Sequence, residues 1–303
     1  MRQILPTNNL LFKKVLASDA NKDILAGLIN DFFNVKAEEI VIEAPYSIDL
    51  YAEILEDKPG VNKSVLRETI KDVAASFKVA DFVSEVQVQH TKFFDERALY
   101  YSFSRFCSNY AKPGEMVLDS KGNPILYSSL RPLFALNILG YSHFKGDSDA
   151  LRIFQLYDPE RDRGYNKELL RLGFFELSKT HIETANHKHW YDYFKTGKAN
   201  SEAPDYIKKA SQIIEWNNLE KEERDVLAEI EKAQAILDTQ VASSYLIGKE
   251  EGKAEGELKG RAEGELKGKK ELVRSLFANG VPLDVIAKSS GFSLDQIQGW
   301  IKS

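Results

Sequence analysis

The chain has 303 residues and a formal net charge of −5, and 43% of its residues are hydrophobic and 29% charged. That composition is typical of a folded protein and excludes a disordered one, and the length allows one large core with an appendage or two domains. Nucleic-acid-binding proteins usually carry a basic excess, so the negative balance counts against binding by overall charge. It still permits a nuclease that combines acids at its site with a local basic rim.

The N-terminal half shows helical periodicity first and strand-like alternation afterwards. Apolar residues at helical spacing predict helices over 10–16, 24–33 and 93–110. Asp19 is placed to cap the second of these helices. β-Formers and alternation predict strands within 41–54 and 64–89, with the break at Lys58-Pro59-Gly60.

The middle of the chain adds further strands. A turn at 119–124 precedes the apolar run Leu133-Phe-Ala-Leu-Asn-Ile-Leu139, which reads as a buried strand. Residues 153–157 and 174–177 resemble strands as well. The mixture predicts an α/β fold in which helices flank a central sheet.

A change of composition near Leu219 predicts a long helix. Glu, Lys and Ala dominate to Ser243, and glycines then recur every four residues from Gly248 to Gly268. Each glycine costs a helix ~1 kcal/mol relative to alanine. The spacing forms a slowly drifting stripe that would let a second helix approach closely, so one interpretation is a self-association helix. The other is a charged, partly helical spacer.

The tail, residues 271–303, is predicted to be a small helical unit. Seven apolar residues are its expected core: Leu272, Leu276, Val285, Ile286, Phe292, Ile297 and Trp300. A glycine turn at Gly291 followed by a capping Ser293 gives the segment the look of a helix–turn–helix. Reading of a DNA groove and a plain helical cap are both open.

The stretch from 70 to 89 carries acids and amides within strand-like sequence. If residues 70–77 and 82–89 form a hairpin, Asp72 pairs across from Glu85 with the turn near Lys78-Val79, and the two backbones lie ~5 Å apart there. That turn lacks the Gly or Asn of a tight hairpin, so a longer or bulged turn is expected.

Such a pair of carboxylates can hold one Mg²⁺ ion, which prefers oxygen ligands. Asp81 competes with Asp72 as the partner of Glu85, but four strand residues separate it by ~13 Å, too far for one ion. Gln87 projects to the same side as Glu85 and can orient a water or a phosphate oxygen. Acids on the solvent face of a strand are nevertheless common without a metal. His181, His187 and His189 are interpreted as surface residues.

At this point the chain resembles the Rpn family of recombination-promoting nucleases and transposases, within the PD-(D/E)xK nuclease superfamily. The pattern Asp-x12-Glu-x-Gln carries the core of the resemblance. The other matching pieces follow in order: Asn9–Lys14, Lys71–Val73, Ser84–Gln87, Phe94–Tyr101, Tyr127–Leu139, Glu176–Lys179 and the Glu-Gly-rich helix.

The resemblance implies a Mg²⁺-dependent (or Mn²⁺-dependent) DNA endonuclease with a restriction-endonuclease-like fold. By this carry-over Asp72 and Glu85 are catalytic metal ligands, and Gln87 stands where the superfamily usually has lysine. Asn9 stands where family members have an acid, which is a better Mg²⁺ ligand than an amide. Slow or conditional cleavage would fit the absence of a lysine at position 87.

Three residues of the helix after the site are candidate DNA contacts. Arg97, Tyr101 and Arg105 are four apart and share one helical face, from which they can grip the DNA backbone. The alternative is that Tyr101 packs in the core and the arginines pair with Asp95 or other nearby acids.

Partners, location and domain limits complete the expectations. The single cysteine, Cys107, excludes an internal disulfide, the opening lacks the apolar run of a secretion signal, and no window nears ~18 uninterrupted apolar residues. We therefore expect a cytoplasmic protein without a membrane span. The predicted domains are a nuclease domain (1–215), the long helix (216–270) and the tail (271–303). The alternative function is a DNA-binding or assembly protein with a silent nuclease site.

Overall fold

The computed structural model describes residues 5–43, 46, 72–165 and 168–302. The chain divides into two compact units, Met1–Glu229 and Ile230–Ser303. The division falls inside one long helix, and each unit is described by itself.

The first unit is built on a six-stranded mixed sheet with the order β1-β2-β3-β4-β8-β5. The strands are β1 (Val41–Ile42), β2 (Asp72–Phe77), β3 (Ala80–Gln87), β4 (Leu133–Leu139), β5 (Leu151–Gln155) and β8 (Leu170–Glu176). β3, β4 and β8 run parallel, whereas β1, β2 and β5 pair antiparallel with their neighbours. β6 (Tyr157–Asp158) and β7 (Arg163–Gly164) form a separate small ribbon.

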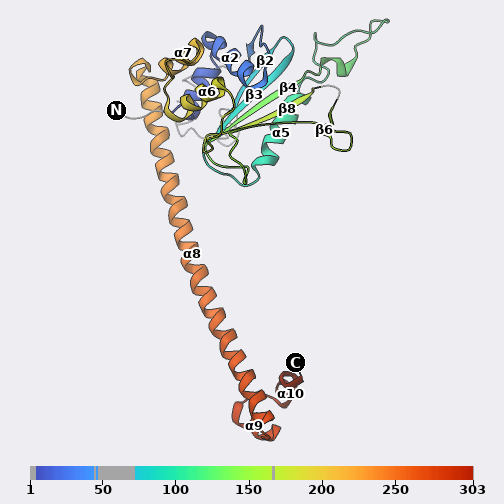
Figure 1. The fold of residues 1–303 in the computed structure, drawn as a ribbon, viewed down its shortest axis with the longest axis vertical. Coiled ribbons are helices and arrows are strands. Elements are labelled where there is room, and N and C mark those ends of the chain that lie inside the picture. The colour runs from blue at the N-terminus through green and yellow to red at the C-terminus, as the bar shows by residue number, and fades with distance from the viewer. Residues whose placement is uncertain (1–4, 44–45, 47–71, 166–167, 303) are drawn as a thin grey trace, which may run out of the picture. The chain divides into compact units, whose positions relative to one another are not determined.

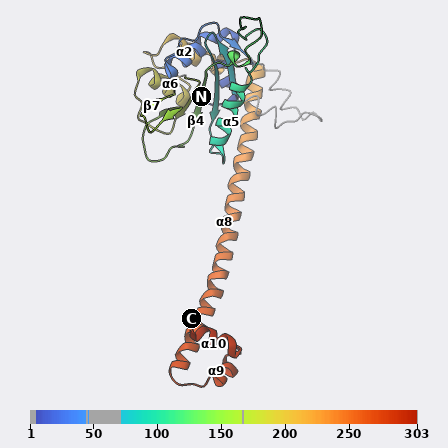
Figure 2. The same cartoon turned by 90° about the vertical axis from the view of Figure 1, so that its right-hand side faces the viewer.

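Helices cover both faces of the sheet (Figures 1 and 2). One face carries α1 (Asn9–Leu16), α2 (Lys22–Phe33), α6 (Ala185–Thr196) and α7 (Asp205–Ile213). There Phe33 of α2 contacts the rings of Phe82 and Phe134. The other face carries α5 (Phe94–Cys107), whose Phe94 and Ala98 pack on β4 and β8. The predicted α/β arrangement is therefore confirmed.

The apolar run of β4 lies at the centre of the sheet. All seven of its residues are buried because strands flank it on both sides and helices cover both faces. The predicted strand over 133–139 is therefore correct to the residue. By contrast, Asp19 does not cap α2: it opens a short 3₁₀ turn, Asp19–Asn21, and Asn21 precedes the helix. Most of the predicted strand 41–54 and residues 64–71 lie outside the described residues.

The long helix α8 (Lys221–Ala278) continues without interruption through the glycine repeat. Apart from its chain neighbours and the backbone of the helix itself, a Cβ added at any of the six glycines from Gly248 to Gly268 would meet no atom within 4 Å. Three ion pairs between residues four apart support this part of the helix, for example Arg261–Glu265. None of the described helices combines the length and the apolar character that crossing a membrane requires.

The second unit ends in a helical hairpin. α9 (Leu283–Ser290) stops at Gly291, whose φ of 75° is readily adopted only by glycine, and α10 (Leu294–Lys302) follows. Ser293 and Gln296 exchange the two hydrogen bonds of a capping box. The prediction that Ser293 caps the second helix of the tail is therefore confirmed. The core consists of Val273, Ile286 and Ile297 with partly buried neighbours. Leu272 and Val285 were expected there, but they are exposed.

Candidate active site

The hairpin of β2 and β3 pairs Asp72 with Glu85, as the sequence predicts. The two strands pair without a break from Asp72–Glu85 to Phe77–Ala80, so only Lys78 and Val79 form the turn. The prediction of a longer or bulged turn is therefore wrong. The backbone N–H of Lys78 donates to the carbonyl oxygen of Glu38 at 2.9 Å, so the tight turn is supported from outside the hairpin. The side chain of Asp72 lies outside the described part of the structure.

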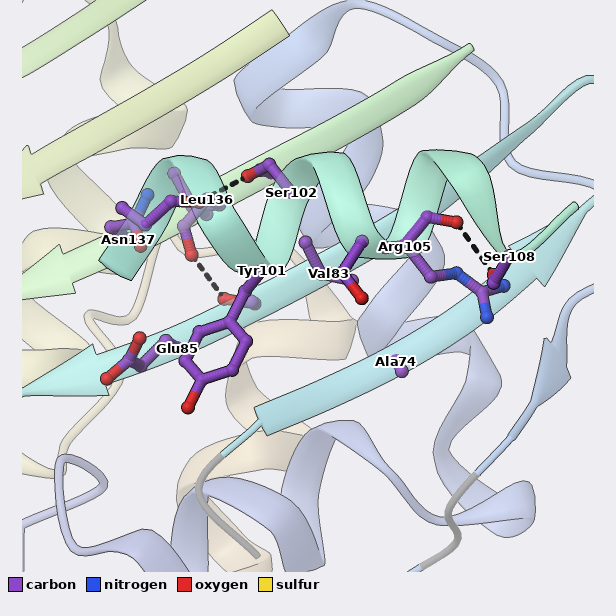
Figure 3. Close-up of a pocket in the computed structure, with 13 residues that line it drawn as sticks. Ala74, Val83, Glu85, Tyr101, Ser102, Arg105, Ser108, Leu136 and Asn137 are labelled. Atoms are coloured by element: carbon purple, nitrogen blue, oxygen red, sulfur yellow. Dashed lines mark hydrogen bonds between the residues drawn. The ribbon is translucent and has the colours of Figure 1, made fainter. Parts of the chain in front are cut away.

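Glu85 is a buried carboxylate in the middle of the sheet. It is only 6% exposed and lies opposite Asn137 of β4 in the parallel register. Glu85 and Asn137 line a hollow of about 300 Å³ between the sheet and α5, whose walls include Ala74, Ala98 and Tyr101 (Figure 3). An isolated charge at such a depth is unfavourable, so Glu85 requires a cation beside it.

Arg97 supplies that cation. Its Nη2 donates to Oε1 of Glu85 at 2.5 Å and to Oε1 of Gln87 at 2.9 Å. Its guanidinium also lies 5.4 Å from the centre of the Phe94 ring. Gln87 is oriented from its other end, because its Nε2 donates to the carbonyl oxygen of Gln89 at 2.8 Å. The first turn of α5 thus places one positive charge on the two predicted site residues of β3.

Arg105 lies two turns further along α5 and is paired elsewhere. It forms ion pairs with Glu43 and with Oδ1 of Asp81, the latter at 3.2 Å. Burial opposes its charge, but these carboxylates outweigh burial and raise the pKa of Arg105. Asp81 also accepts a hydrogen bond from Asn109. Asp81 therefore belongs to a structural ion pair and not to the pair around Glu85.

Arg97 and Arg105 both pair with nearby acids, which is the alternative to DNA contact that the sequence left open. Those acids do not include Asp95, which hydrogen-bonds to Nε2 of His143 at 2.7 Å. Tyr101 is half-buried at the hollow and is not a core residue. Contact of Arg97, Tyr101 and Arg105 with DNA stays a prediction. The surface interpretation is wrong for His187, which is buried and hydrogen-bonded to the carbonyl oxygen of Asp31.

Two further polar residues near the site escaped the sequence reasoning. Tyr141 has a buried hydroxyl that makes no hydrogen bond within the described part of the chain. Burial raises the pKa of Tyr141 to about 12, with Arg97 and Glu85 among the charges that act on it, so the phenol stays neutral and can donate. The sequence offered a clue to Asn137, since it is the one polar residue in the apolar run of β4. No sequence feature pointed to Tyr141.

The donor set fits a hard divalent cation. Glu85 offers a carboxylate and Gln87 an amide oxygen, the ligand types that Mg²⁺ accepts, and the guanidinium of Arg97 shows that these oxygens face a positive charge. Within the described residues no group of three or more His, Cys, Asp or Glu side chains could hold a metal. The second carboxylate that the sequence predicts, that of Asp72, is not among those side chains, because it lies outside the described part of the structure.

The model of the PD-(D/E)XK nuclease family transposase matches residues 6–244. This chain belongs to that family. No curated protein and no solved structure matches it. In this chain the order β1-β2-β3, α5, β4 is consistent with a restriction-endonuclease-like fold, and the matched span contains the hairpin, Arg97 and the hollow under α5. The match ends within α8, so the end of that helix and the tail lie beyond it.

Proposed function

We propose that this chain is a divalent-metal-dependent DNA endonuclease in which Asp72 and Glu85 hold Mg²⁺ or Mn²⁺. One observation carries the proposal: Asp72 and Glu85 are cross-strand partners beneath α5, inside the span that matches the nuclease family. Position 72 is two residues from Ala74, which lines the same hollow as Glu85.

Each described residue has a defined task in this proposal. Glu85 would hold the cation, which would supply a water of lowered pKa and positive charge to offset the negative charge on the phosphodiester. Gln87 is neutral and cannot act as a general base, so its task is to orient the attacking water or a phosphate oxygen by hydrogen bonding. The hydroxyl of Tyr141, which makes no hydrogen bond within the described residues, would donate one to a phosphate oxygen of the DNA. Tyr101 and Arg105 are the remaining candidates for contacts with the DNA backbone.

The test is nicking of a supercoiled plasmid over a titration of Mg²⁺. We expect Glu85→Gln and Asp72→Asn each to lower the rate by about a hundredfold or more, since each removes a charged ligand that acts on the transition state. Glu160→Gln is the matched control, because Glu160 is an exposed acid outside the hairpin. Equal cutting by wild type and the two site variants would assign the activity to a contaminant or to another site.

The departures Gln87 and Asn9 favour a second candidate, a DNA-binding or assembly protein with a silent site. Gln87 brings no positive charge of its own, and Asn9, a half-buried residue that opens α1, brings no carboxylate. This candidate predicts that wild type binds DNA without cutting it at any Mg²⁺ concentration, and that Glu85→Gln leaves binding unchanged.

A further inference from the structure

The guanidinium of Arg97 takes the place against Glu85 that a divalent cation would take. Its Nη2 contacts Oε1 of Glu85, an oxygen that a hard cation would use, and Oε1 of the neighbouring Gln87. We propose that Arg97 is a resident counter-cation that the metal displaces from Glu85, and that the displaced guanidinium then binds a phosphate of the DNA. The inference rests on the proposed function and adds an order of events to it.

Electrostatics make the two cations alternatives. A buried carboxylate needs a positive partner before the metal arrives, which explains why Arg97 sits there. A divalent ion bound to the carboxylate would bring two positive charges within ~4 Å of a guanidinium on the same oxygens, and the repulsion would favour departure of the guanidinium. Arg97 and the metal therefore compete for Glu85.

The surroundings of Arg97 allow it to move without a change of backbone. It belongs to the first turn of α5, and its side chain is 27% exposed. Its Nε makes no hydrogen bond within the described residues, so the two acceptors on β3 and the ring of Phe94 hold it. Release from Glu85 leaves a charged, planar donor beside the metal, where a phosphate would bind.

The first test is binding of Mn²⁺ to the full chain without DNA at pH 8, by calorimetry or electron paramagnetic resonance. We expect Arg97→Gln to bind Mn²⁺ about tenfold more tightly than wild type, because the competing cation is gone. The Mn²⁺ affinity of Arg97→Lys should lie between those of wild type and Arg97→Gln. Arg131→Gln is the control with the same charge change, since Arg131 pairs with Glu115 elsewhere. Equal or weaker Mn²⁺ binding by Arg97→Gln overturns the inference.

A second measurement follows the displacement in the wild-type protein itself. The Arg97 side-chain resonance of wild type, assigned with Arg97→Lys, is followed by ¹H–¹⁵N NMR during addition of Mg²⁺. We expect the resonance to move toward the position of a solvent-exposed arginine, with faster exchange of its hydrogens. A resonance unchanged at saturating Mg²⁺ overturns the inference.

The phosphate contact is tested by DNA affinity with Ca²⁺ in place of Mg²⁺ and with chelator. With Ca²⁺, Arg97→Gln should weaken binding and reduce the slope of log affinity against log salt by about 1, as for one lost phosphate contact. With chelator it should bind as wild type does, because Arg97 is then held by Glu85. Equal losses in both conditions contradict displacement.

The two proposals fail in different ways. If Glu85→Gln binds Mn²⁺ as tightly as wild type, no metal site exists at Glu85, and the proposed function fails together with the inference. If Glu85→Gln abolishes Mn²⁺ binding but Arg97→Gln does not tighten it, the metal site stands and only the competition by Arg97 is wrong.

Discussion

By the resemblance, Gln87 is expected to stand at the lysine position of the nuclease motif, and Arg97 brings a positive charge to the same point. Its Nη2 lies 2.9 Å from the amide oxygen of Gln87. A lysine at 87 would set a second cation against Arg97, whereas a neutral amide accepts its hydrogen bond. The residue types at 87 and 97 are thus compatible as a pair, and the charge comes from the helix and not from the strand.

Arg105 offers a test of the buried ion pair at the other end of the hollow. Asp81 is 1% exposed, so Arg105→Met leaves a buried carboxylate that keeps the hydrogen bond from Asn109. We expect this change to lower the free energy of unfolding by about 3 kcal/mol, measured by urea denaturation. Glu43→Gln should cost less, because Glu43 is more exposed and its loss leaves no buried charge.

The double variant Arg105→Met with Asp81→Asn is the control for that prediction. It removes the stranded charge, so part of the lost stability should return. If the double variant is no more stable than Arg105→Met alone, the cost comes from lost packing of the arginine and not from the unpaired carboxylate.

Sequence reasoning at this scale predicted the pairing of Asp72 with Glu85 but not the partners of the arginines. The pairing follows from strand alternation, which is local. The contact of Arg97 with Glu85 depends on how α5 packs on the sheet, and spacing along a helix says only that Arg97 and Arg105 share a face. The metal role of Asp72 and Glu85 stays a prediction.

Among the elements, those with strong periodicity were predicted well and those determined by distant contacts were not. β4 was predicted to the residue because its sequence is apolar at every position except Asn137. The tight Lys78-Val79 turn was missed because its support comes from Glu38, forty residues earlier in the chain. Asp19 failed as a cap because a 3₁₀ turn precedes α2 and shifts the helix start to Lys22.

The glycine repeat shows where the rules for an isolated helix do not settle the outcome. Propensity predicts that six glycines melt a lone helix, yet α8 is continuous through them. Its i,i+4 ion pairs supply part of the compensation. The open space beside every one of these glycines is compatible with a second helix and equally with solvent. Self-association through α8 stays a proposal.

The first turn of α8 is joined to α1 through Glu223, and this contact predicts a dependence on pH. Burial alone would raise the pKa of Glu223, but hydrogen bonds from Lys14 and Tyr46 outweigh it and lower the pKa from 4.5. A carboxyl whose pKa is lower in the folded state than in the unfolded state stabilises the protein at pH values above its unfolded-state pKa. That contribution is lost as the pH falls through the folded-state pKa.

We therefore expect Glu223→Gln to lower the free energy of unfolding by about 2 kcal/mol at pH 7, and this difference to shrink as the pH falls below about 4.5. Urea denaturation at pH 7, 5 and 3.5 measures it. Glu222→Gln, an exposed neighbour in the same turn, controls for the change of charge. A difference that is constant with pH would show that Glu223 contributes through packing instead.

At the scale of the whole chain, changes of composition predicted three domains. Limits at 215 and 270 were predicted where composition changes, whereas the compact units divide at Glu229 and Ile230, within α8. A continuous helix can pass from one packed unit into another, because its hydrogen bonds are local and do not report what its side chains contact. The predicted domain limits stay proposals.

The division into units predicts that the C-terminal hairpin can be unfolded by itself. Ile286 is fully buried among Val273 and Ile297, and a core of this size provides only a few kcal/mol. Ile286→Ala should cost about 3 kcal/mol, which is enough to open the hairpin. Hydrogen exchange followed by mass spectrometry should then show lost protection in α9 and α10, with β3 and β4 unchanged.

Val285→Ala is the matched control, because Val285 is exposed and its truncation should have little effect. Loss of protection in β3 and β4 as well would mean that the two units unfold as one.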